Sequence, residues 1–543
     1  MAWLPPWRHA IVQTNVVSTA VRRKYAKGDS KLSRRDQAEA VPDGPGSGLF
    51  EQLIAQSASH LSNLAYIGEN LEASYGDMID EALSAGSQIN ESTGVPGPIA
   101  TIISDPRARV PAVLAVSAAR RALIPLDPEW PEERKQAIIK NFACAGILVD
   151  ESNAFSDIGA TDKKIEILGA GLYSAPTPSF PAEPWHDHIS RMEYVLFTSG
   201  STGSPKGVGV GLSASRRHID AFVEWSNLGA RDRVFQFARL AFDTSQEEIW
   251  PALFAGATLV ASVAKLPTFT QLQDRLGATG VTVLELPTAY WRQWSHHLRN
   301  KKLSLERLRL MLIGGEAAYE RDAYAWRTGA LSTVRLVNSY GSTETGIMDS
   351  AYEVPATVED SPRPLPIGKP ISPRKFRLDD PVDGVGELLV SSPTLADGYF
   401  TPTGLIQNRF LDLPDGRWFR TGDLVESGSD STYAFRGRVD RRVKILGQRV
   451  ELEAVEAALL HSGVEEARVE VVDDDRGSPR LSAIVVGEID SAEIRSRLAR
   501  TLPPAFVPAR IHIVDSLPKN ASGKIDVPAV RKMLQATDGA PGR

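Results

Sequence analysis

One short stretch, Leu196 to Val208, constrains the fold of this chain more than any other. It reads Leu-Phe-Thr-Ser-Gly-Ser-Thr-Gly-Ser-Pro-Lys-Gly-Val and continues an apolar run that begins at Tyr194. Such an apolar run predicts a buried strand. Glycines let the following backbone approach a ligand closely, and successive N–H groups beside a lysine form a concave site for an anion. We therefore expect a strand that leads into a polyphosphate-binding loop.

This loop is not the common P-loop, in which Gly-Lys-Ser/Thr leads directly into a helix. Pro205 precedes Lys206, Gly207 follows it, and a second apolar run continues to Leu212. Because a proline disfavours helical geometry in the residue before it, we expect the loop to stay open. The alternative is a flexible linker, which the two flanking apolar runs argue against. The residues expected to hold phosphate are Thr198, Ser199, Gly200, Ser201, Thr202, Gly203 and Lys206.

The composition is that of an ordinary globular protein. Hydrophobic residues make up 42% of the 543 residues and charged residues 24%, and the net charge of -6 gives no indication of binding to nucleic acid or to an anionic membrane. No apolar run reaches the ~18 residues of a membrane span. The single cysteine, Cys144, excludes a disulfide framework. We interpret Cys144 as a core residue rather than a catalytic thiol, and we expect a reducing, cytoplasmic location.

Residues 1–47 differ from the rest of the chain. Arg8, Arg22, Arg23, Lys24 and Lys27 all precede the first acidic residue in the sequence. A start that carries arginines and lacks acids is typical of organelle transit peptides. We favour the alternative, a disordered extension or a start codon assigned too early.

From residue 48, strand and helix patterns alternate. Residues 99–104 predict a strand, residues 110–122 predict a helix, and Ser74 is a candidate N-cap. Such alternation predicts a mostly parallel sheet covered by helices. From residue 441 the pattern changes to that of a small α+β unit, which ends in a polar loop around Lys524. The expected domains are a large α/β domain over 48–440, a small domain over 441–530 and a tail over 531–543.

Polar residues gather where the predicted strands end. Asp243 follows one strand, with Thr244 or Ser245 as a cap for the next helix, and Tyr340 and Glu344 follow another strand. Because the carboxyl ends of parallel strands form the ligand rim of an open α/β sheet, we expect one shared site. Glu344 suits Mg²⁺, which takes oxygen ligands, and Tyr340 suits stacking on a purine.

Three further features leave alternatives open on the residues alone. A lone aspartate such as Asp243 is more often a helix cap than a ligand. Asp423, after a Thr-Gly pair, suits either a turn or the two hydroxyls of a ribose. His296 and His297 lie in sequence without an evident partner, and we interpret them as surface residues rather than metal ligands.

Taken in order, these motifs resemble those of the adenylate-forming superfamily, which contains acyl-CoA synthetases, luciferases and the amino-acid adenylation domains of nonribosomal peptide synthesis. The resemblance covers about residues 48 to 530. It rests on the 196–208 loop, Phe242-Asp-Thr-Ser, Tyr340-Gly-Ser-Thr-Glu, Arg420-Thr-Gly-Asp-Leu, the hinge-like run from Tyr433 to Glu451, and Lys524. The chain departs from the family pattern at Arg120-Arg121, Arg442 and Leu446.

The resemblance implies a large N-terminal domain of parallel, helix-covered sheets with a small β-barrel region, and a mobile C-terminal α+β domain that swings about Asp440. It implies that a substrate carboxylate attacks the α-phosphate of ATP and that the acyl-adenylate then passes to a thiol. The residues implied to be catalytic are Lys524, Glu344 (with Mg²⁺), Lys206 and Thr198. The further nucleotide contacts implied are Ser199, Gly200, Ser201, Thr202, Gly203, Gly314, Gly315, Glu316, Asn338, Ser339, Tyr340, Gly341, Ser342, Thr343, Asp423, Tyr433 and Arg438.

In the amino-acid-activating relatives, the position of Asp243 binds the substrate ammonium. The pocket implied by family position is lined by Asp243, Thr244, Glu247, Ala289, Leu312, Gly314, Ser339, Ile347 and Met348. The second acid, Glu247, indicates a polar or basic side chain. The expected acceptor is the phosphopantetheine thiol of a carrier protein in trans. A small activating partner is kept as a further alternative. The alternatives are an acyl- or aryl-CoA ligase and a non-catalytic nucleotide-binding relative.

Overall fold

The computed structural model describes residues 48–152, 164–177, 186–189, 191–198, 206–298, 305–428, 430–439, 442–445, 448–473, 479–518 and 525–536. Several predictions therefore lie outside the described residues. They concern the basic extension 1–47, the loop residues Ser199 to Gly203, the hinge Asp440, Leu446, Lys524 and the end of the tail.

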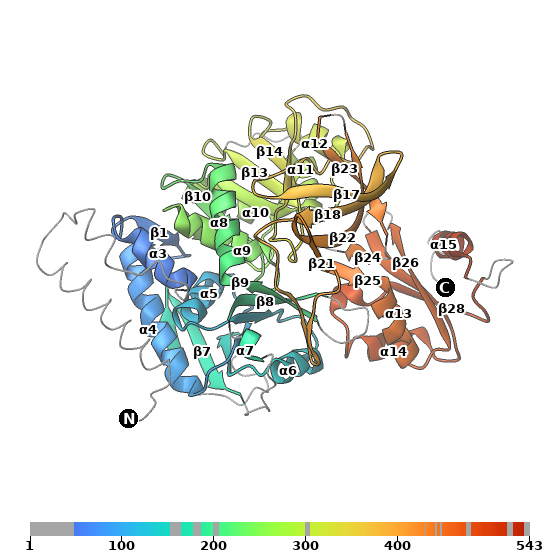
Figure 1. The fold of residues 1–543 in the computed structure, drawn as a ribbon, viewed down its shortest axis with the longest axis horizontal. Helices are drawn as coiled ribbons and strands as arrows, with labels where there is room; N and C mark the ends of the chain where they lie inside the picture. Colours follow the sequence, from blue (N-terminus) through green and yellow to red (C-terminus); the bar gives the residue numbers. More distant parts are fainter. Residues whose placement is uncertain are drawn as a thin grey trace, which may run out of the picture.

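The first of two nine-stranded sheets has the order β16-β15-β14-β13-β12-β10-β11-β1-β2 (Figure 1). Its central neighbours run parallel: β14 (Arg335–Tyr340), β13 (Leu310–Gly314), β12 (Val283–Pro287), β10 (Arg233–Gln236), β11 (Thr258–Ala261) and β1 (Leu64–Ile67). The antiparallel strands lie at its edges: β15 (Ser350–Glu353), β16 (Lys369–Pro370) and β2 (Glu72–Ser74). The carboxyl ends of β10, β12, β13 and β14 therefore meet at one edge.

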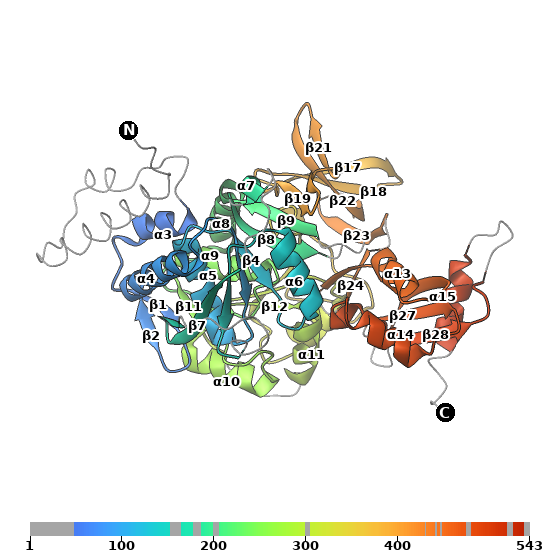
Figure 2. The same ribbon diagram turned by 90° about the horizontal axis from the view of Figure 1, so that it is seen from below.

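The second sheet has the order β20-β19-β9-β8-β4-β3-β5-β7-β6 (Figure 2). Its strands are β20 (Gly404–Ile406), β19 (Gly398–Thr401), β9 (Lys206–Gly211), β8 (Met192–Thr198), β4 (Leu123–Leu126), β3 (Ile99–Ile102), β5 (Gly146–Asp150), β7 (Ala170–Pro176) and β6 (Lys164–Ile167). Strands β8 and β9 are antiparallel, with Thr198 in register with Lys206. A strand rather than a helix thus contains Lys206, which confirms the predicted difference from a P-loop.

Helices cover these sheets, as predicted. They are α3 (Leu49–Ser57), α4 (Tyr75–Thr93), α5 (Arg109–Ala118), α6 (Glu132–Asn141), α7 (His186–Ile189), α8 (Leu212–Ser226), α9 (Thr244–Phe254), α10 (Phe269–Thr279), α11 (Thr288–Leu298) and α12 (Glu320–Arg327). Ser74 caps α4 through a reciprocal capping box with Asp77, which confirms the predicted N-cap. Cys144 is a buried free thiol, and burial raises its pKa to about 12, in agreement with its interpretation as a core residue.

An antiparallel sheet follows in the stretch where a small β-barrel region was expected. Strands β17 (Lys375–Val382), β18 (Val385–Ser391), β22 (Gly416–Ser427) and β21 (Phe410–Leu413) lie in that order, and β23 (Tyr433–Arg438) pairs with β22. Asp423 lies in register with Arg438 inside this pairing, which excludes the turn, one of the two alternatives that the sequence left open for Asp423.

The remaining elements form a smaller α+β part. They are β24 (Arg442–Ile445), β25 (Gln448–Glu451), α13 (Leu452–His461), β26 (Glu466–Asp473), β27 (Pro479–Val486), α14 (Ser491–Leu498), β28 (Arg510–Val514) and α15 (Val527–Ala536). Its two apolar clusters contain only residues from Val443 onward. Figures 1 and 2 place β24 on the side of this part that faces the large sheets. The predicted fold class is confirmed, while the division at residues 440 and 441 stays a prediction.

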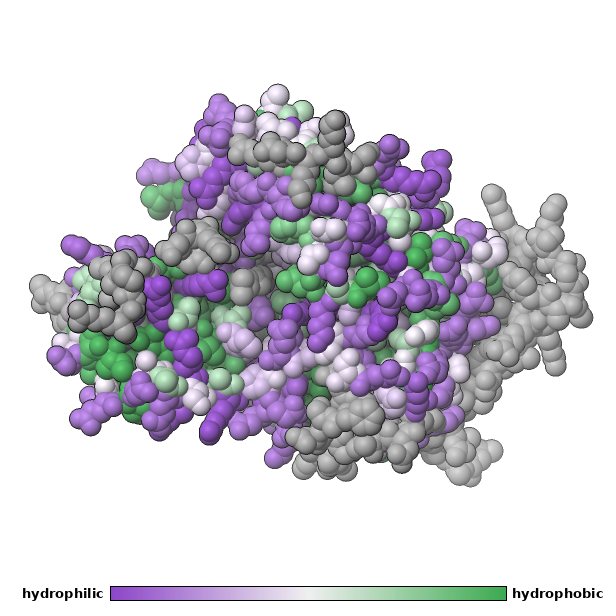
Figure 3. Space-filling view, turned by 180° about the vertical axis from the view of Figure 1, so that it is seen from behind, coloured by the Kyte–Doolittle hydropathy of each residue, from purple (hydrophilic) through white to green (hydrophobic). Residues whose placement is uncertain are grey.

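The surface is mostly polar on the face shown in Figure 3, with apolar groups gathered at the end where the small part lies. Large exposed hydrophobic residues of this part include Leu460, Ile513 and Met533. Within the described ranges, no helix combines the length and apolarity needed to cross a bilayer.

Candidate active site

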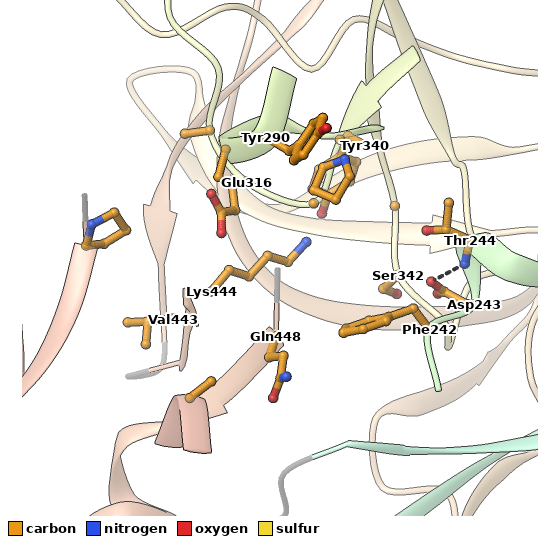
Figure 4. A pocket seen from close by; sticks show the side chains of 18 of the residues that line it. Phe242, Asp243, Thr244, Tyr290, Glu316, Tyr340, Ser342, Val443, Lys444 and Gln448 are labelled. Carbon is orange, nitrogen blue, oxygen red and sulfur yellow. Dashed lines mark hydrogen bonds between the residues drawn. The ribbon is translucent and has the colours of Figure 1, made fainter. Parts of the chain in front are cut away.

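A cavity of about 1290 Å³ opens at the carboxyl edge of the first sheet, between the large sheets and the small part. The ends of β13 and β14 and the start of α9 line one side, and β24 and β25 line the other (Figure 4). Most of the predicted site residues meet here. Those that line the cavity are Asp243, Thr244, Glu247, Ala289, Gly314, Gly315, Glu316, Asn338, Ser339, Tyr340, Gly341, Ser342, Thr343, Ile347, Met348, Asp423 and Arg438.

Other predicted residues lie away from the lining of the cavity. Leu312 is fully buried in the first sheet, where it packs into the core. Glu344 is only 1% exposed, and its Oε1 accepts a hydrogen bond of 2.8 Å from the Tyr399 hydroxyl. Tyr433 packs against Phe376 in the antiparallel sheet, and Lys206 starts β9. Their proposed roles remain predictions from sequence.

Two buried charged side chains fix the end of β10, from which the chain turns into α9. The Arg109 Nη1 group donates a 2.7 Å hydrogen bond to the Phe237 carbonyl. The Glu248 carboxylate accepts hydrogen bonds of 3.0–3.1 Å from the N–H groups of Phe237 and Ala238. Both side chains bind the backbone at the end of β10. They therefore fix the start of the segment that leads to Asp243, five residues after Ala238.

Asp243 caps a helix, which is one of the two alternatives that the sequence left open, and it also lines the cavity. It is itself the N-cap of α9, so the expectation of Thr244 or Ser245 as the cap was wrong: Asp243 Oδ1 accepts a 2.9 Å hydrogen bond from the Thr244 N–H. Its Oδ2 accepts a 2.6 Å hydrogen bond from the Thr343 hydroxyl. Burial raises the pKa of Asp243, with Glu247 adding to the rise and Lys444 opposing it. The carboxylate is thus positioned at the cavity wall (Figure 4).

Two further carboxyls line the cavity beyond Asp243. Glu247 follows on α9, with its Oε2 2.6 Å from Nε2 of His218, which comes from α8. Glu285, on β12, lies beside Glu247, close enough for each carboxyl to affect the pKa of the other. Burial raises the pKa of Glu247 to about 8 and raises that of Glu285 well above its ordinary value. Burial also lowers the pKa of His218 well below its usual range, so this imidazole is neutral.

Sequence analysis did not assign Glu285 to the site. It is the one charged residue in the apolar strand Val283-Leu-Glu-Leu-Pro287. An acidic side chain in the interior of an otherwise apolar strand is costly to bury without a partner. This isolated glutamate was therefore a sign, visible in the sequence, that the strand contributes to a polar site.

The opposite end of the cavity contains a connected set of polar groups. The Tyr340 hydroxyl donates a 2.5 Å hydrogen bond to Asp423 Oδ2, and the Arg438 guanidinium donates to Asp423 Oδ1. Arg438 Nη2 also donates to the Thr421 carbonyl at 3.1 Å. Tyr340, Asp423 and Arg438 were predicted separately as nucleotide contacts, and the structure brings them together through strands β14, β22 and β23.

The chain between β14 and β15 folds tightly beside the cavity. A Cβ atom on Gly341 would lie 1.9 Å from the Ile347 carbonyl oxygen, so only glycine fits there. Ile347 itself has a φ of 66°, which is an outlier for a β-branched residue. Such strain is characteristic of functional sites. Here the turn brings Ile347 and Met348 to the cavity wall.

Lys444 is a second residue that sequence reasoning missed. It extends from β24 into the cavity, where Glu316, Tyr340 and Ser342 lie around it (Figure 4). Its charge lowers the pKa of Asp243. The signal was a lysine between Val443 and Ile445 in a run that we had interpreted only as a hinge.

The carboxylate of Glu344 is a ligand of the kind that a magnesium ion takes, because Mg²⁺ binds through one or two carboxylates together with phosphate oxygens. Glu344 supplies a buried carboxylate directly after Thr343.

His296, in α11, lies with its Nε2 3.3 Å from Asp322 Oδ1. In the part of the chain that the structure describes, no group of three or more His, Cys, Asp or Glu side chains is arranged to hold a metal.

Two large sheets, an antiparallel third sheet and a small α+β part around one cavity define an enzyme of the adenylate-forming type. The chain belongs to the family of AMP-binding enzymes. The family model described as "AMP-binding enzyme" matches residues 54–400, and the model described as "AMP-binding enzyme C-terminal domain" matches residues 453–524. The predicted family and enzyme class, an AMP-forming ligase, are thereby confirmed.

Curated relatives include much longer synthases. The isonitrile lipopeptide synthase of Streptomyces coeruleorubidus is 33% identical over 540 residues, which cover 94% of this chain and 35% of the relative. Tyrocidine synthase 1 of Brevibacillus parabrevis is 28% identical over 527 residues, which cover 93% of this chain and 46% of the relative. This chain therefore spans less than half the length of these two relatives.

Solved structures share the fold. One is the Vibrio cholerae adenylation domain AlmE in complex with glycyl-adenosine-5'-phosphate, with a TM-score of 0.72, 23% identity, and coverage of 91% of this chain and 99% of that chain. Another is a holo NRPS protein containing adenylation and PCP domains, with a TM-score of 0.75, 23% identity, and coverage of 89% and 84%.

Proposed function

We propose that this protein activates the carboxylate of an amino acid with ATP, forming an aminoacyl-adenylate and releasing pyrophosphate. One observation carries the choice of an amino acid, namely the position of Asp243. Its buried carboxylate lines the cavity and is held by the Thr244 N–H and the Thr343 hydroxyl. A buried carboxylate needs a cationic partner, and a substrate ammonium supplies one. The substrate of an acyl- or aryl-CoA ligase has no ammonium group for this carboxylate to bind.

The nucleotide lies at the opposite end of the cavity in this proposal. The Asp423 carboxylate, held between Tyr340 and Arg438, accepts hydrogen bonds from the ribose hydroxyls. Tyr340 and the Gly314-Gly315 backbone hold the adenine, with Glu316, Asn338, Ser339 and the 341–343 turn around it. The substrate carboxylate is thereby directed toward the α-phosphate between the two ends.

In the reaction itself, a carboxylate oxygen of the amino acid attacks the α-phosphorus, and the bond from that phosphorus to the bridging oxygen breaks as pyrophosphate leaves. Lys206 and the loop hydroxyls bind the β- and γ-phosphates, and Lys524 bridges the carboxylate and α-phosphate. Magnesium held by Glu344 would supply neutralising charge on the phosphates. Positive groups aimed at the developing charge are the main source of catalysis in such a transfer.

The second step that we propose is transfer of the aminoacyl group to the phosphopantetheine thiol of a carrier protein in trans. The thiol sulfur attacks the carbonyl carbon, its proton leaves, and AMP departs. Two structural neighbours pair an adenylation domain with a PCP domain, one of them in an artificial fusion, which supports this kind of acceptor. We propose that the small part swings about Asp440 between the two steps. A small activating partner remains part of the proposal.

The experiment that tests the first step is amino-acid-dependent ATP–pyrophosphate exchange, screened over α-amino, β-amino and aryl acids with Lys524→Ala as the control. We expect exchange with an α-amino acid and its loss in the control. Exchange only with acids that lack an amine, followed by CoA-dependent AMP release, would replace the proposal with the CoA-ligase alternative.

The expected cytoplasmic location rests on the single buried thiol of Cys144, and cell fractionation tests it.

A further inference from the structure

The amino-acid end of the cavity continues past Asp243 into a pocket that ends in two more acids. Glu247 lies four residues after Asp243, at the start of α9, so the two residues are separated by about one helical turn, ~6 Å along the helix axis. Glu285 enters from β12 and meets Glu247. All three side chains line the same cavity.

Groups behind the pair compensate its charge only in part. Neither carboxylate oxygen of Glu247 has a hydrogen-bond partner of good geometry among the described residues, although His218 Nε2 lies 2.6 Å away. The charge of Arg374 lowers the pKa of Glu247. The same guanidinium has other partners, because its Nη2 donates a hydrogen bond to the Gly346 carbonyl at 2.8 Å and its Nε lies 3.6 Å from Asp349. One guanidinium therefore faces several buried acids.

Two carboxyls in hydrogen-bonding reach of each other cannot both stay ionised unless a cation lies beside them. A proton shared by the two carboxyls can take the place of this cation. A substrate ammonium in the same place would displace the proton and leave the pair fully ionised. An uncharged alkyl side chain could not, and it would keep a buried polar pair without a partner in the complex.

We propose that Glu247 and Glu285 select an amino acid whose side chain ends in an ammonium a few carbons from Cα, that is, a diamino acid. This inference rests on the proposed function and deepens it. The α-ammonium binds Asp243, and the distal ammonium binds Glu285 and Glu247 about one helical turn away. The apolar side chain of Met348, which also lines the cavity, contacts the methylene groups between the two charges.

The experiment compares matched substrates in ATP–pyrophosphate exchange. L-Ornithine and L-lysine are paired with L-norvaline and L-norleucine, which keep the chain and lack the distal charge, and L-arginine tests a guanidinium. We expect the kcat/KM of the better diamino acid to exceed that of its uncharged partner roughly 100-fold or more, because a site built for a polar group rejects an analogue that lacks it. We expect arginine to be a poorer substrate than the preferred diamino acid.

Glu285→Gln is the decisive variant, with Glu285→Asp as a conservative partner. Glu285→Gln should lower kcat/KM for the diamino acid about 30-fold or more, mainly through KM, and should thereby remove most of its advantage over the uncharged analogue. Glu285→Asp should restore part of the preference. The matched control is Glu129→Gln, which removes an exposed acid at the rim of the cavity.

The outcomes separate the two proposals. Exchange with an uncharged amino acid as the preferred substrate, unchanged by Glu285→Gln, would overturn the assignment of the acidic pair and leave amino-acid activation intact. Preference for arginine over both diamino acids would overturn the choice of an ammonium. Absence of exchange with every amino acid would overturn the proposed function itself. A thermal melt of each variant identifies any that fail to fold.

Discussion

The two ends of the cavity differ in how fully their buried acidic groups are paired. At the nucleotide end, both oxygens of Asp423 already accept hydrogen bonds, one from Tyr340 and one from Arg438. At the amino-acid end, Glu247 and Glu285 face each other with Arg374 as a partial counter-charge behind them. The first end is complete without a ligand, whereas the second holds an excess of acid.

This difference corresponds to what each end must do. In the proposed reaction every amino acid is paired with the same nucleotide, so a preformed contact to the ribose would suffice. The amino-acid end must distinguish among similar molecules, and a buried polar site that only the right partner satisfies gives large discrimination. The cost is stability, because buried acids without a full complement of partners destabilise the unliganded fold.

The largest effect that we predict separates the two ends. Asp243→Ala removes the partner of a buried substrate ammonium, and loss of one member of such a pair costs about 2–5 kcal/mol. We expect the KM of the amino acid to rise about 30-fold or more while the KM of ATP hardly changes, both measured by pyrophosphate exchange. An unchanged amino-acid KM would show that Asp243 does no more than cap α9.

Asp423→Ala is the counterpart at the nucleotide end. It leaves Tyr340 and Arg438 without their shared acceptor and removes the ribose contact. We expect the KM of ATP to rise about 10-fold or more, since hydrogen bonds to charged groups contribute about 1.5–3 kcal/mol. The order of preference among amino acids should be the same as in wild type. A changed order would mean that the two ends are not independent.

The third prediction concerns pH and sharpens the comparison. The pair binds an ammonium only in its ionised form, and the pKa of Glu247 is raised to about 8. The KM of a diamino acid should therefore fall as pH rises toward 8, by up to about tenfold per unit, whereas that of an uncharged analogue should not. The charged or titratable groups that face Glu247 are Asp243, His218, Glu285, Asp349, Arg374 and Tyr194.

A parallel pH profile of KM for the charged and the uncharged substrate would contradict this prediction. The Glu285→Gln variant is its control. With one carboxyl of the pair gone, the remaining one should ionise at lower pH, and the profile for the diamino acid should shift toward acid.

The smallest predicted effect is on stability. A glutamate that titrates near 4.3 when unfolded, but whose folded pKa is raised by burial, holds its proton more tightly in the native state. Its contribution to stability is present at low pH and is lost as pH rises through that window toward 8. Glu247→Gln should therefore raise the melting temperature at pH 8, by about 1–3 °C, and less at pH 5. A variant that melts lower than wild type at both values would count against this account.

Much of the site could be predicted because its residues stand where strands end. Asp243 and Tyr340 follow apolar runs, and chain direction alone brings such positions to one edge of a parallel sheet. The exact use of a side chain was harder to predict. Asp243 caps α9 through the N–H of the adjacent Thr244, but its second hydrogen bond comes from Thr343, which is distant in sequence. Asp423 lies inside a strand pairing, which also depends on residues outside its own stretch of the sequence.

Glu285 and Lys444 show where sequence reasoning failed. Each lies inside a strand rather than at its end, so its direction depends on register and on which face the tertiary structure covers. Ala289 was predicted in the pocket and does line it, but Glu285, four residues earlier, carries the charge. Leu312 and Glu344 lie behind the cavity lining, a distinction that no spacing in the sequence contains.

The measurement that tests the central claim most directly is detection of the acyl-adenylate itself. The full chain, ATP and magnesium would be incubated with each amino acid in turn and with amine-free analogues, and the product identified by mass after rapid quenching. We predict an aminoacyl-adenylate that forms with an α-amino acid and is lost in Asp243→Ala at the same substrate concentration. An adenylate that forms equally with the amine-free analogue, or survives undiminished in Asp243→Ala, would contradict the account.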